Sequence, residues 1–366
     1  MSITATKKKK DGLMQYRVRV GLKQPDGSFR YVERTAYGIN EARRVESELR
    51  SAPPVSVRTL AALIDEYNLS RAGQVRQTTQ EKADSYLRLH VLPTYGTYNV
   101  ERLTLPVLQQ WKNELNAKGL SVVSKNNIYH AFSSVLNFGV KMEYLKKNNL
   151  AALGGFRDPN VSPEDSRFRY YTADQFKAYI NALPRATFLD RAAYVFFMVA
   201  FYSGARKGEI NALRWSDIDG DVIHIRRSVA QKVKGAAYVE TPPKNKSSYR
   251  DVRMPQTLRA CLDEHLAFCR SFEQFSPDWR VCGGPDILSD NFLFTRNCKN
   301  AEAAGLPRIT IHEFRHSHAT LLINAGVNIK EISRRLGHST VEMTWNVYSH
   351  LYPDQEEKAL AVLDSV

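Results

Sequence analysis

Residues 312–350 read HEFRHSHATLLINAGVNIKEISRRLGHSTVEMTWNVYSH, and they bring four chemically useful side chains into one short run. His312 and Arg315 are three positions apart, a spacing that places both on one face of a helix. A guanidinium beside an imidazole suits an anionic phosphate, because arginine donates two parallel hydrogen bonds to phosphoryl oxygens. The stretch thus predicts a helix that offers a phosphate site, followed by His338 and Tyr348.

The same residues also match HExxH, the spacing with which zinc hydrolases set two histidines and a glutamate base on one helix face. Here these would be His312, Glu313 and His316. The third ligand is missing, because Ser317-His318-Ala319-Thr320-Leu321 stands where the zinc-protease continuation needs a glycine and a histidine. Glu331 lies on a later segment and fits that role poorly. A zinc peptidase is therefore the weaker interpretation.

A second motif lies upstream, where residues 203–210 read SGARKGEI at the end of an apolar helical run. Glu209 follows Arg206 by three positions, so both lie on the same helix face. On their own they have a plainer interpretation, in which Arg206 caps a helix and Glu209 is an exposed partner.

A third element, residues 240–250, reads ETPPKNKSSYR. It lies between two strand-like segments, Val222–Arg226 and Asp251–Met254. The segment carries two lysines, Lys244 and Lys246.

This ordered set resembles the tyrosine recombinase family, phage and conjugative-element integrases in particular. The family signature is an arginine in a (T/S)GxRxxE(L/I) box, a β-hairpin lysine, an HxxR box, an LGH(S) box and a tyrosine, and all five occur here in that order. Ser203 and Ile210 stand where the commonest form has Thr and Leu, and both changes are conservative. The resemblance covers the C-terminal half in detail and the remainder in outline.

The resemblance implies a role for each matching residue. Arg206 and Arg315 would grip the non-bridging oxygens of the scissile phosphate and stabilise its pentacoordinate transition state. Tyr348 would be the nucleophile, leaving a 3′-phosphotyrosine and a free 5′-hydroxyl. Because that bond keeps the phosphodiester energy, the reaction would need no ATP, no cofactor and no metal.

Proton transfer and support fall to the remaining residues. Lys244 would be the general acid for the 5′-oxygen leaving group, with Lys246 as the alternative. His312 would accept a proton or bind the phosphate, and His338 would donate a hydrogen bond to the phosphate and brace the site. Glu209 would orient the site from behind Arg206.

The N-terminal residues have a β-like pattern. Residues 16–23 alternate apolar and basic side chains with the period of two that marks a strand, and residues 29–37 read as the returning strand. Residues 3–9 could add a third strand, although Lys7–Lys10 could instead be a disordered arm along a DNA backbone. A helix begins near Asn40. A small sheet with a basic face suits insertion into a DNA groove, and a solvated outer face is the alternative.

The middle of the chain, from Ser56 to about Leu153, has a helical pattern between two linkers. The predicted helices are Val57–Asn68, Thr78–Val91, Leu105–Ala117 and Ser121–Tyr144. Several of their starts are plausible caps.

The predicted architecture is multidomain and mainly α with small β elements. An arm-type DNA-binding domain, a three-stranded sheet plus a helix, covers residues 1–52, and a helical, SAM-like core-binding domain covers 56–155. A mixed α/β catalytic domain covers 168–366. Its last segment, Asp354–Val366, has apolar residues at helical spacing and is predicted to be a tail helix, which in the family often docks on a neighbouring protomer. Packing within its own chain is the alternative.

Composition agrees with a nucleic-acid partner. Lys and Arg number 52 against 38 Asp and Glu, a net charge of +14, and a basic surface gains affinity for a phosphate backbone by releasing counterions. The four cysteines form no CxxC pair, and no stretch resembles a signal peptide or a membrane span. A cytoplasmic protein is expected.

The resemblance therefore implies a site-specific recombinase, an integrase that moves a prophage or another mobile element. Its partners would be double-stranded DNA, at core-type and arm-type sites, and three further copies of itself in a tetramer. An excisionase and a host DNA-bending protein are usual in the family, and the setting would be the nucleoid of a bacterial host. A type IB topoisomerase-like relaxase shares this chemistry, and a DNA-binding protein without activity is a second alternative.

Overall fold

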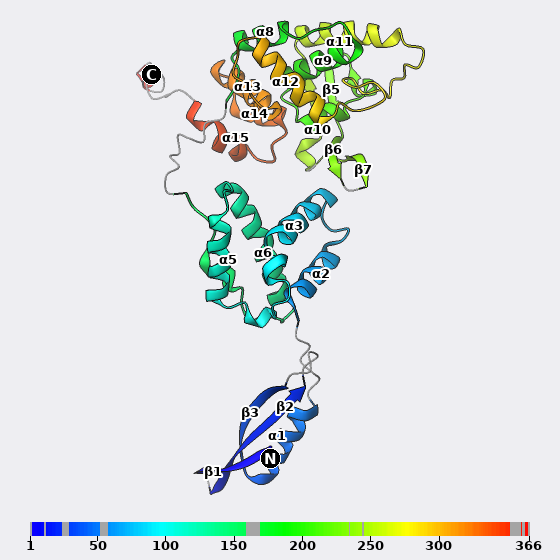
Figure 1. Cartoon of the computed structure of the whole chain (residues 1–366). Coiled ribbons are helices and arrows are strands. Elements are labelled where there is room, and N and C mark those ends of the chain that lie inside the picture. Colours follow the sequence, from blue (N-terminus) through cyan, green and yellow to red (C-terminus); the bar gives the residue numbers. More distant parts are fainter. Residues whose placement is uncertain are drawn as a thin grey trace. The chain divides into compact units, whose positions relative to one another are not determined.

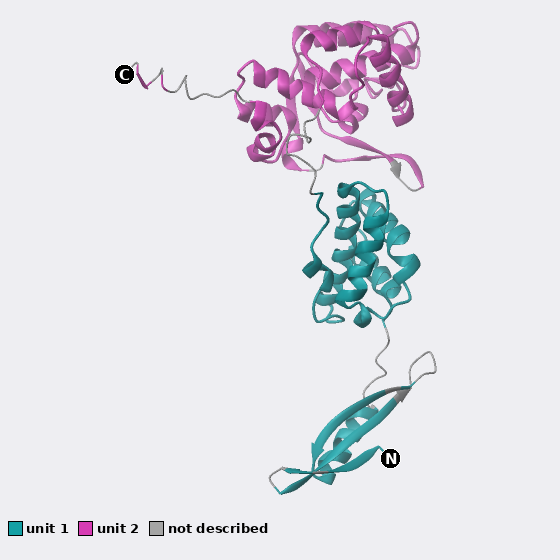
Figure 2. Ribbon diagram, turned by 60° about the vertical axis from the view of Figure 1, so that its left-hand side comes forward, with its two compact units in different colours: residues 1–160 teal, residues 161–366 magenta. Residues whose placement is uncertain are grey.

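The computed structural model describes residues 2–10, 12–23, 29–51, 58–158, 169–233, 235–243, 245–351, 360 and 363–364. The chain divides into two compact units, residues 1–160 and 161–366 (Figure 2). Most of the predicted tail helix, and Lys244, fall outside the described residues. In the described part of the chain, no helix combines the length and the apolar character that a membrane span needs.

Unit 1 begins with an antiparallel sheet of order β1-β2-β3 followed by a helix (Figure 1). These elements are β1 (Ile3–Lys10), β2 (Leu13–Lys23), β3 (Phe29–Tyr37) and α1 (Ile39–Ser51). The alternation in β2 has the expected effect: Val18 and Val20 are buried in the cluster that α1 covers, whereas Arg17 and Arg19 are exposed. The predicted three strands and helix are confirmed. The alternative of a disordered arm at Lys7–Lys10 is wrong, because these residues end β1, where Lys9 pairs with Met14 of β2.

The rest of unit 1 is helical around its own apolar cluster. Its elements are α2 (Leu60–Arg71), α3 (Gln77–His90), α4 (Leu92–Tyr95), η1 (Val100–Arg102), α5 (Leu105–Ala117), α6 (Val122–Lys141) and α7 (Asn149–Leu153). The four long helices correspond to the four predicted ones. Thr59 and Ser121 cap α2 and α6 through their hydroxyls, which accept backbone N–H bonds and satisfy donors that a helix start leaves unpaired. Trp111 and Phe132 meet edge-on in the core.

Unit 2 is mainly helical, with two small sheets. Its helices are α8 (Ala173–Asn181), α9 (Phe188–Ser203), α10 (Lys207–Ala212), α11 (Gln256–Arg270), α12 (Asp290–Ala303), α13 (Ile311–Asn324), α14 (Ile329–Leu336) and α15 (Val341–Tyr348), with the 3₁₀ turns η3 (Trp215–Asp217), η4 (Lys246–Ser248) and η5 (Ser349–Leu351). α9 is buried along most of its length and packs against α11 and α13 (Figure 1). A helix that is apolar on nearly all sides belongs at the centre of a core.

One sheet of unit 2 was foreseen and the other was not. β4 (Ile218–Asp219), β5 (Val222–Ile225) and β8 (Arg250–Arg253) form an antiparallel sheet, and its last two strands match the predicted segments within one residue. Between them, β6 (Ser228–Val233) and β7 (Ala236–Thr241) pair as a separate hairpin. These two strands were not predicted from the sequence. The predicted fold class, mainly α with small β elements, is confirmed.

Two motif glycines have a structural reason. Gly204 ends α9 with φ +63°, and Gly337 ends α14 with φ +67°, a left-handed conformation in which side-chain-bearing residues are strained. A Cβ on Gly204 would lie 2.7 Å from Cδ2 of His318, and one on Gly337 would lie 2.9 Å from Nη1 of Arg250. The glycines of the SGxR and LGH motifs therefore let the backbone turn where other side chains press closely.

Gly204→Ala is expected to destabilise the protein by more than backbone strain alone, which costs roughly 1–3 kcal/mol for a residue other than glycine in this conformation. The reason is the additional clash with His318, which is itself buried. Urea denaturation of the full chain measures the loss. Gly326→Ala is the matched control, because Gly326 has φ +75° but open space around the added Cβ. Equal losses for the two variants would contradict the expected clash.

Candidate active site

Arg206 stands at the start of α10, where Glu209 holds it. The Arg206 backbone N–H donates to one Glu209 carboxylate oxygen and its Nη1 to the other, each at 2.9 Å. Nη2 also reaches the carbonyl of Gly337, at 3.4 Å. Burial alone would raise the pKa of Glu209, but Arg250 and Arg206 outweigh it and the pKa is lowered. Glu209 is therefore a buried carboxylate that fixes the direction of the Arg206 side chain.

Arg315 reaches the same place from α13 with its side chain almost fully buried. Its Nη1 donates to the carbonyl of Gly204 at 2.8 Å, whereas its Nη2 is buried and has no hydrogen-bond partner among the described residues. Burial, with Arg206 and Arg250 nearby, lowers the pKa of Arg315 to about 9. A buried guanidinium with an unused donor, repelled by other cations, is a site that an anion would stabilise.

Arg250 is a member of this cluster that the sequence analysis did not single out. Its Nη2 lies 2.8 Å from Glu209, and the side chains of both residues are 3% exposed. Nε and Nη1 donate to the carbonyls of Arg335 and Ser248, at 2.7 and 3.1 Å. Its position in the strand could have indicated that Arg250 is buried. Alternation along β8 puts Arg250 on the same side as buried Val252. A buried arginine needs a specific partner.

The two motif histidines lie near these arginines. Nδ1 of His338 lies 2.8 Å from the Thr344 hydroxyl, and burial followed by Arg315 lowers the pKa of His338 to about 4. The pKa of His312 is lowered as well, by desolvation in the cleft and then by Arg315 and Arg206. Both imidazoles are thus neutral near pH 7, so each offers one donor and one acceptor nitrogen.

Tyr348 ends α15 and is 1% exposed. Its hydroxyl lies 2.8 Å from Nδ1 of His316, a residue of α13 to which the sequence analysis gave no role in the reaction. Burial raises the pKa of Tyr348 to about 12, although Arg315 acts in the opposite direction. No sequence signal announces this contact, because the two residues are 32 positions apart and meet only through the packing of the fold.

The lysine assignment stays a prediction. Lys244 lies outside the described residues, and Lys246 has an exposed side chain at the start of η4. The carbonyl of Ser248, two residues after Lys246, accepts the hydrogen bond from Arg250. The turn that begins with Lys246 is therefore joined to the arginine cluster by this hydrogen bond.

The HExxH residues are engaged in other ways. Glu313 closes a capping box with Thr310 at the start of α13, so its carboxylate serves the helix end. The rings of His312 and His316 meet edge-on with centroids 4.9 Å apart, and Nδ1 of His316 faces the Tyr348 hydroxyl. Among the described residues no group of three or more His, Cys, Asp or Glu side chains is placed to share a metal ion.

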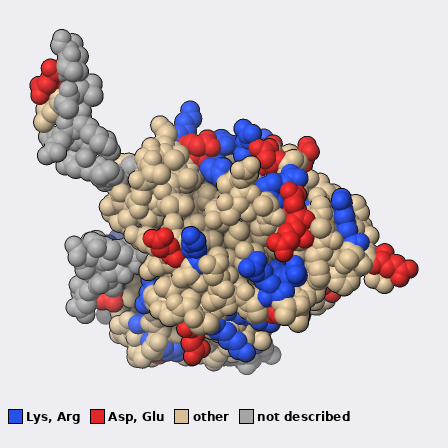
Figure 3. Space-filling model, turned by 90° about the horizontal axis from the view of Figure 1, so that it is seen from above, with Lys and Arg blue, Asp and Glu red and all other residues tan. Residues whose placement is uncertain are grey.

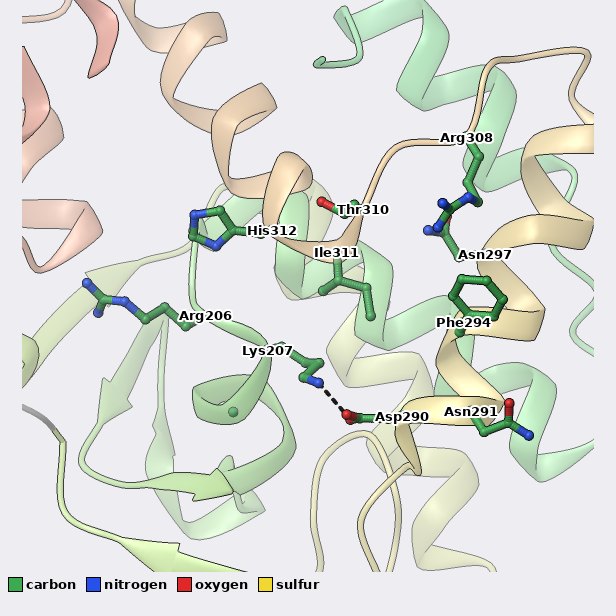
Figure 4. Close-up of a pocket in the computed structure, with 11 residues that line it drawn as sticks. Arg206, Lys207, Asp290, Asn291, Phe294, Asn297, Arg308, Thr310, Ile311 and His312 are labelled. Carbon is green, nitrogen blue, oxygen red and sulfur yellow. Dashed lines mark hydrogen bonds and ion pairs between the residues drawn. The ribbon is translucent and has the colours of Figure 1, made fainter. Parts of the chain in front are cut away.

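A cleft of about 740 Å³ opens beside Arg206 and His312 (Figure 4). On its other side lie Asn291 and Phe294 of α12. Lys207 pairs with Asp290 across its floor at 2.7 Å. The remaining lining residues are Gly208, Asn297, Arg308, Thr310 and Ile311. The cleft gives a large ligand access to two of the candidate catalytic residues.

The chain is similar to integrases in sequence and in structure. Residues 169–355 match the phage integrase family. The chain is 28% identical over 333 residues to the ICEBs1 integrase of Bacillus subtilis (strain 168), covering 88% of this chain and 86% of that protein. It is 22% identical over 377 residues to the prophage integrase IntR of Escherichia coli (strain K12), covering 93% and 86%.

Solved structures agree on the fold. The Tn1549 transposon integrase in complex with transposon right end DNA superposes with a TM-score of 0.66 at 20% identity, over 84% of this chain and 99% of that one. A lambda integrase tetramer bound to a Holliday junction superposes with a TM-score of 0.55 at 18% identity, over 91% and 95%. The family match covers the part of the chain that holds the whole arginine, histidine and tyrosine cluster. The chain therefore belongs to the phage integrase family and is a tyrosine recombinase.

Proposed function

We propose that the chain is a site-specific DNA recombinase that integrates or excises a mobile element through a 3′-phosphotyrosine at Tyr348. The observation that carries this proposal is the buried Nη2 of Arg315, which has no hydrogen-bond partner among the described residues. It lies in a cluster of three guanidiniums, Arg206, Arg250 and Arg315, around one buried carboxylate, Glu209. Such an excess of positive charge fits a phosphate, and Tyr348 is near enough for Arg315 to lower its pKa.

The roles follow from the chemistry of each group. Arg206 and Arg315 bind the non-bridging phosphate oxygens, where donors aimed at developing charge act most strongly. His338 donates one further hydrogen bond from a neutral ring. Lys244, or Lys246, protonates the 5′-oxygen as it leaves. Glu209 holds Arg206 in place.

The assembly is proposed by analogy with the relatives. The two sequence relatives are named as the ICEBs1 integrase and as a prophage integrase, and the lambda integrase structure is a tetramer on a Holliday junction. By analogy, four copies of this chain act on two duplexes. Residues 1–52 bind arm-type sites, 56–155 bind the core site and 168–366 carry out the reaction. An excisionase and a host DNA-bending protein assist in the bacterial cytoplasm, at the nucleoid.

One face of unit 2 carries charged side chains of both signs (Figure 3). Figure 3 shows the face of this unit that is uppermost in Figure 1, near α8, α9 and α11, and there basic and acidic side chains are interspersed among the described residues. A surface that holds DNA through its phosphates needs a positive excess. Because the charges on this face are mixed, we assign the DNA not to this face but to the cleft beside Arg206 and His312.

Strand exchange between two different duplexes tests the function. We expect the full chain, with EDTA present, to join two labelled duplexes that each carry an end of the mobile element encoding it. A relaxase would only remove supercoils from a plasmid and leave the two duplexes unjoined. A DNA-binding protein without activity would shift both duplexes on a native gel and yield neither product.

Arg315→Lys is expected to slow DNA cleavage by about 10²–10³-fold, the usual cost of removing one donor from such a site. The planar guanidinium of arginine holds its donors in fixed directions, so that one can bind the Gly204 carbonyl and another a phosphate oxygen. The single ammonium of lysine cannot reproduce that geometry. Single-turnover cleavage on a nicked duplex measures the rate. Arg270→Lys is the control, because Arg270 lies on the exposed end of α11. A cleavage rate for Arg315→Lys within a few-fold of the wild-type rate would remove Arg315 from the reaction.

A further inference from the structure

Tyr348 is held by a histidine that lies outside the five family motifs. Nδ1 of His316 lies 2.8 Å from the Tyr348 hydroxyl oxygen, with the ring centroids 5.6 Å apart. This distance is within the range that direct proton transfer requires. His316 follows Arg315 directly and lies one helical turn beyond His312 on α13, so the same helix presents to one site a phosphate-binding guanidinium and the ring that touches the nucleophile.

We propose that His316 is the catalytic base, whose Nδ1 takes the proton of Tyr348 as the phenol oxygen attacks the scissile phosphorus. This inference rests on the proposed function and assigns one more residue to the same reaction. It requires the neutral tautomer with hydrogen on Nε2, which leaves Nδ1 as an acceptor. Tyr348 is protonated near pH 7, since burial raises its pKa to about 12, so its hydroxyl can donate to that nitrogen.

The bonds and protons balance in both directions. In cleavage the O–H bond of Tyr348 breaks while its O–P bond forms, and the proton moves to His316, which becomes an imidazolium. The P–O bond to the 5′-oxygen breaks, and that oxygen takes a proton from the proposed lysine acid. In ligation the 5′-hydroxyl attacks the phosphotyrosine and returns its proton to the lysine, while a new P–O bond to the 5′-oxygen forms. The O–P bond to Tyr348 breaks, and the departing tyrosine oxygen recovers the proton from His316.

The environment makes His316 a weak base until DNA arrives. Burial, then His312 and Arg315, lower its pKa to about 4, with Glu313 acting in the opposite direction. A scissile phosphate bound to Arg315 would bring negative charge beside this ring and partly cancel the repulsion. Proton transfer from Tyr348 is thereby coupled to phosphate binding, and the free protein does not ionise its nucleophile.

Other charged groups on the described elements packed against α13 have contacts of their own or are exposed. On the elements packed against α13, Arg334 of α14 pairs with Glu331, and Arg335 donates to backbone carbonyls of Arg253 and Tyr202. On η5, which also contacts α13, His350 has an exposed side chain. The groups that shift the pKa of His316 include His312, Arg315 and Glu313, and its Nδ1 contacts the Tyr348 hydroxyl.

Two histidines of α13, His312 and His316, differ in exposure and in the groups that they face. His312 has an exposed side chain that lines the cleft with Arg206 (Figure 4), which suits contact with the phosphate. His316 is half-buried, packs edge-on against His312 and faces Tyr348. Of the two roles that the family resemblance left open for His312, phosphate binding is the one that remains for it.

His316→Gln tests the proposal by the pH dependence of cleavage. Single-turnover cleavage would be measured on a nicked suicide duplex carrying the end of the mobile element that encodes the chain. The variant should be slower by about 10²-fold at neutral pH, in the range typical of a lost general base. Its rate should rise about tenfold per pH unit, because the tyrosine must then ionise before it attacks. The wild-type rate should stay nearly flat over the same range.

A merely structural role for His316 would give a different result. Glutamine can still hydrogen-bond to Tyr348, so a positioning residue would give a slower reaction with the wild-type pH profile, and that outcome overturns the proposal. His316→Ala should regain activity when imidazole is added at high concentration, whereas absence of rescue in a variant that still binds the duplex would also overturn it. His224→Gln, a histidine on β5 paired with Asp251, should leave both rate and profile unchanged.

The same experiment distinguishes the two proposals. If the wild-type protein forms no covalent complex on a duplex that it binds, the proposed function fails and the inference fails with it. If the wild-type protein forms the complex and His316→Gln matches it in rate and pH profile, the recombinase function stands and only the role of His316 is wrong.

Discussion

Tyr348→Phe is expected to abolish covalent attachment to DNA, with a loss of cleavage of at least about 10⁴-fold. The variant lacks only the hydroxyl, the group through which the proposed reaction attaches the protein to DNA, while the buried ring keeps its packing against α13 and α14. The wild-type protein should form a protein–DNA band on a denaturing gel after incubation with a nicked suicide duplex in EDTA. That band should be missing for the variant.

Binding and folding controls make this result interpretable. Tyr348→Phe should shift the duplex on a native gel as the wild-type protein does, because the hydroxyl faces His316 inside the protein. Tyr202→Phe, on α9 of the same unit, should retain the covalent band. A covalent complex that persists in Tyr348→Phe would mean that another side chain is the nucleophile. Dependence of the wild-type band on added metal would contradict metal-free cleavage.

Much of this site could be predicted because its members are fixed by local sequence. The capping box of Thr310 and Glu313 starts α13, so the spacing of His312 and Arg315 becomes a shared helix face. Gly337 ends α14 in the only backbone region that permits the turn before His338. In unit 1, the alternation of apolar and basic side chains in β2 is likewise a local pattern, and it predicted that strand. Motifs and periodicity therefore located the long helices of unit 1 and most of the cluster.

The features that were missed depend on contacts between distant segments. The hairpin of β6 and β7 lies outside the β4-β5-β8 sheet and has few buried residues, so its hydrophobic pattern is weak. The meeting of His316 with Tyr348 depends on how α13 packs near the end of α15 and against η5, which follows it. Arg250 is buried only because Glu209 and two carbonyls surround it, and nothing within its own segment specifies those partners.

Arg250→Ala is expected to destabilise the protein by roughly 3–5 kcal/mol, the usual cost of removing one partner from a buried ion pair. Glu209 would remain buried with Arg206 as its ion-pair partner, and the side chain of Arg206 is 37% exposed. The carbonyls of Arg335 and Ser248 would also lose their donors. Urea denaturation measures the loss. Arg253→Ala is the matched control on the same strand, and little change is expected because Arg253 and Asp221 form an exposed pair.

The pH dependence of stability provides an independent check. The folded-state pKa of Glu209 lies below its ordinary value of 4.5, so its contribution to stability is present above that value and is lost as the pH falls through the folded-state pKa. The wild-type protein should therefore lose stability in acid more steeply than Arg250→Ala, in which the pKa of Glu209 is no longer held down by Arg250. Equal acid sensitivity of the two proteins would mean that Arg250 does not stabilise the charge of Glu209.

A double substitution separates stability from reaction. Arg250→Met with Glu209→Gln removes both charges and keeps similar volumes, which often restores most of the stability lost when a buried pair is broken. Cleavage should nevertheless stay slow, since the neutral amide that replaces the Glu209 carboxylate would be a weaker partner for Arg206. If stability and cleavage recovered together, the Arg250–Glu209 pair would be a packing feature. Recovery of stability alone would show that the pair serves the reaction by holding Arg206 at the phosphate.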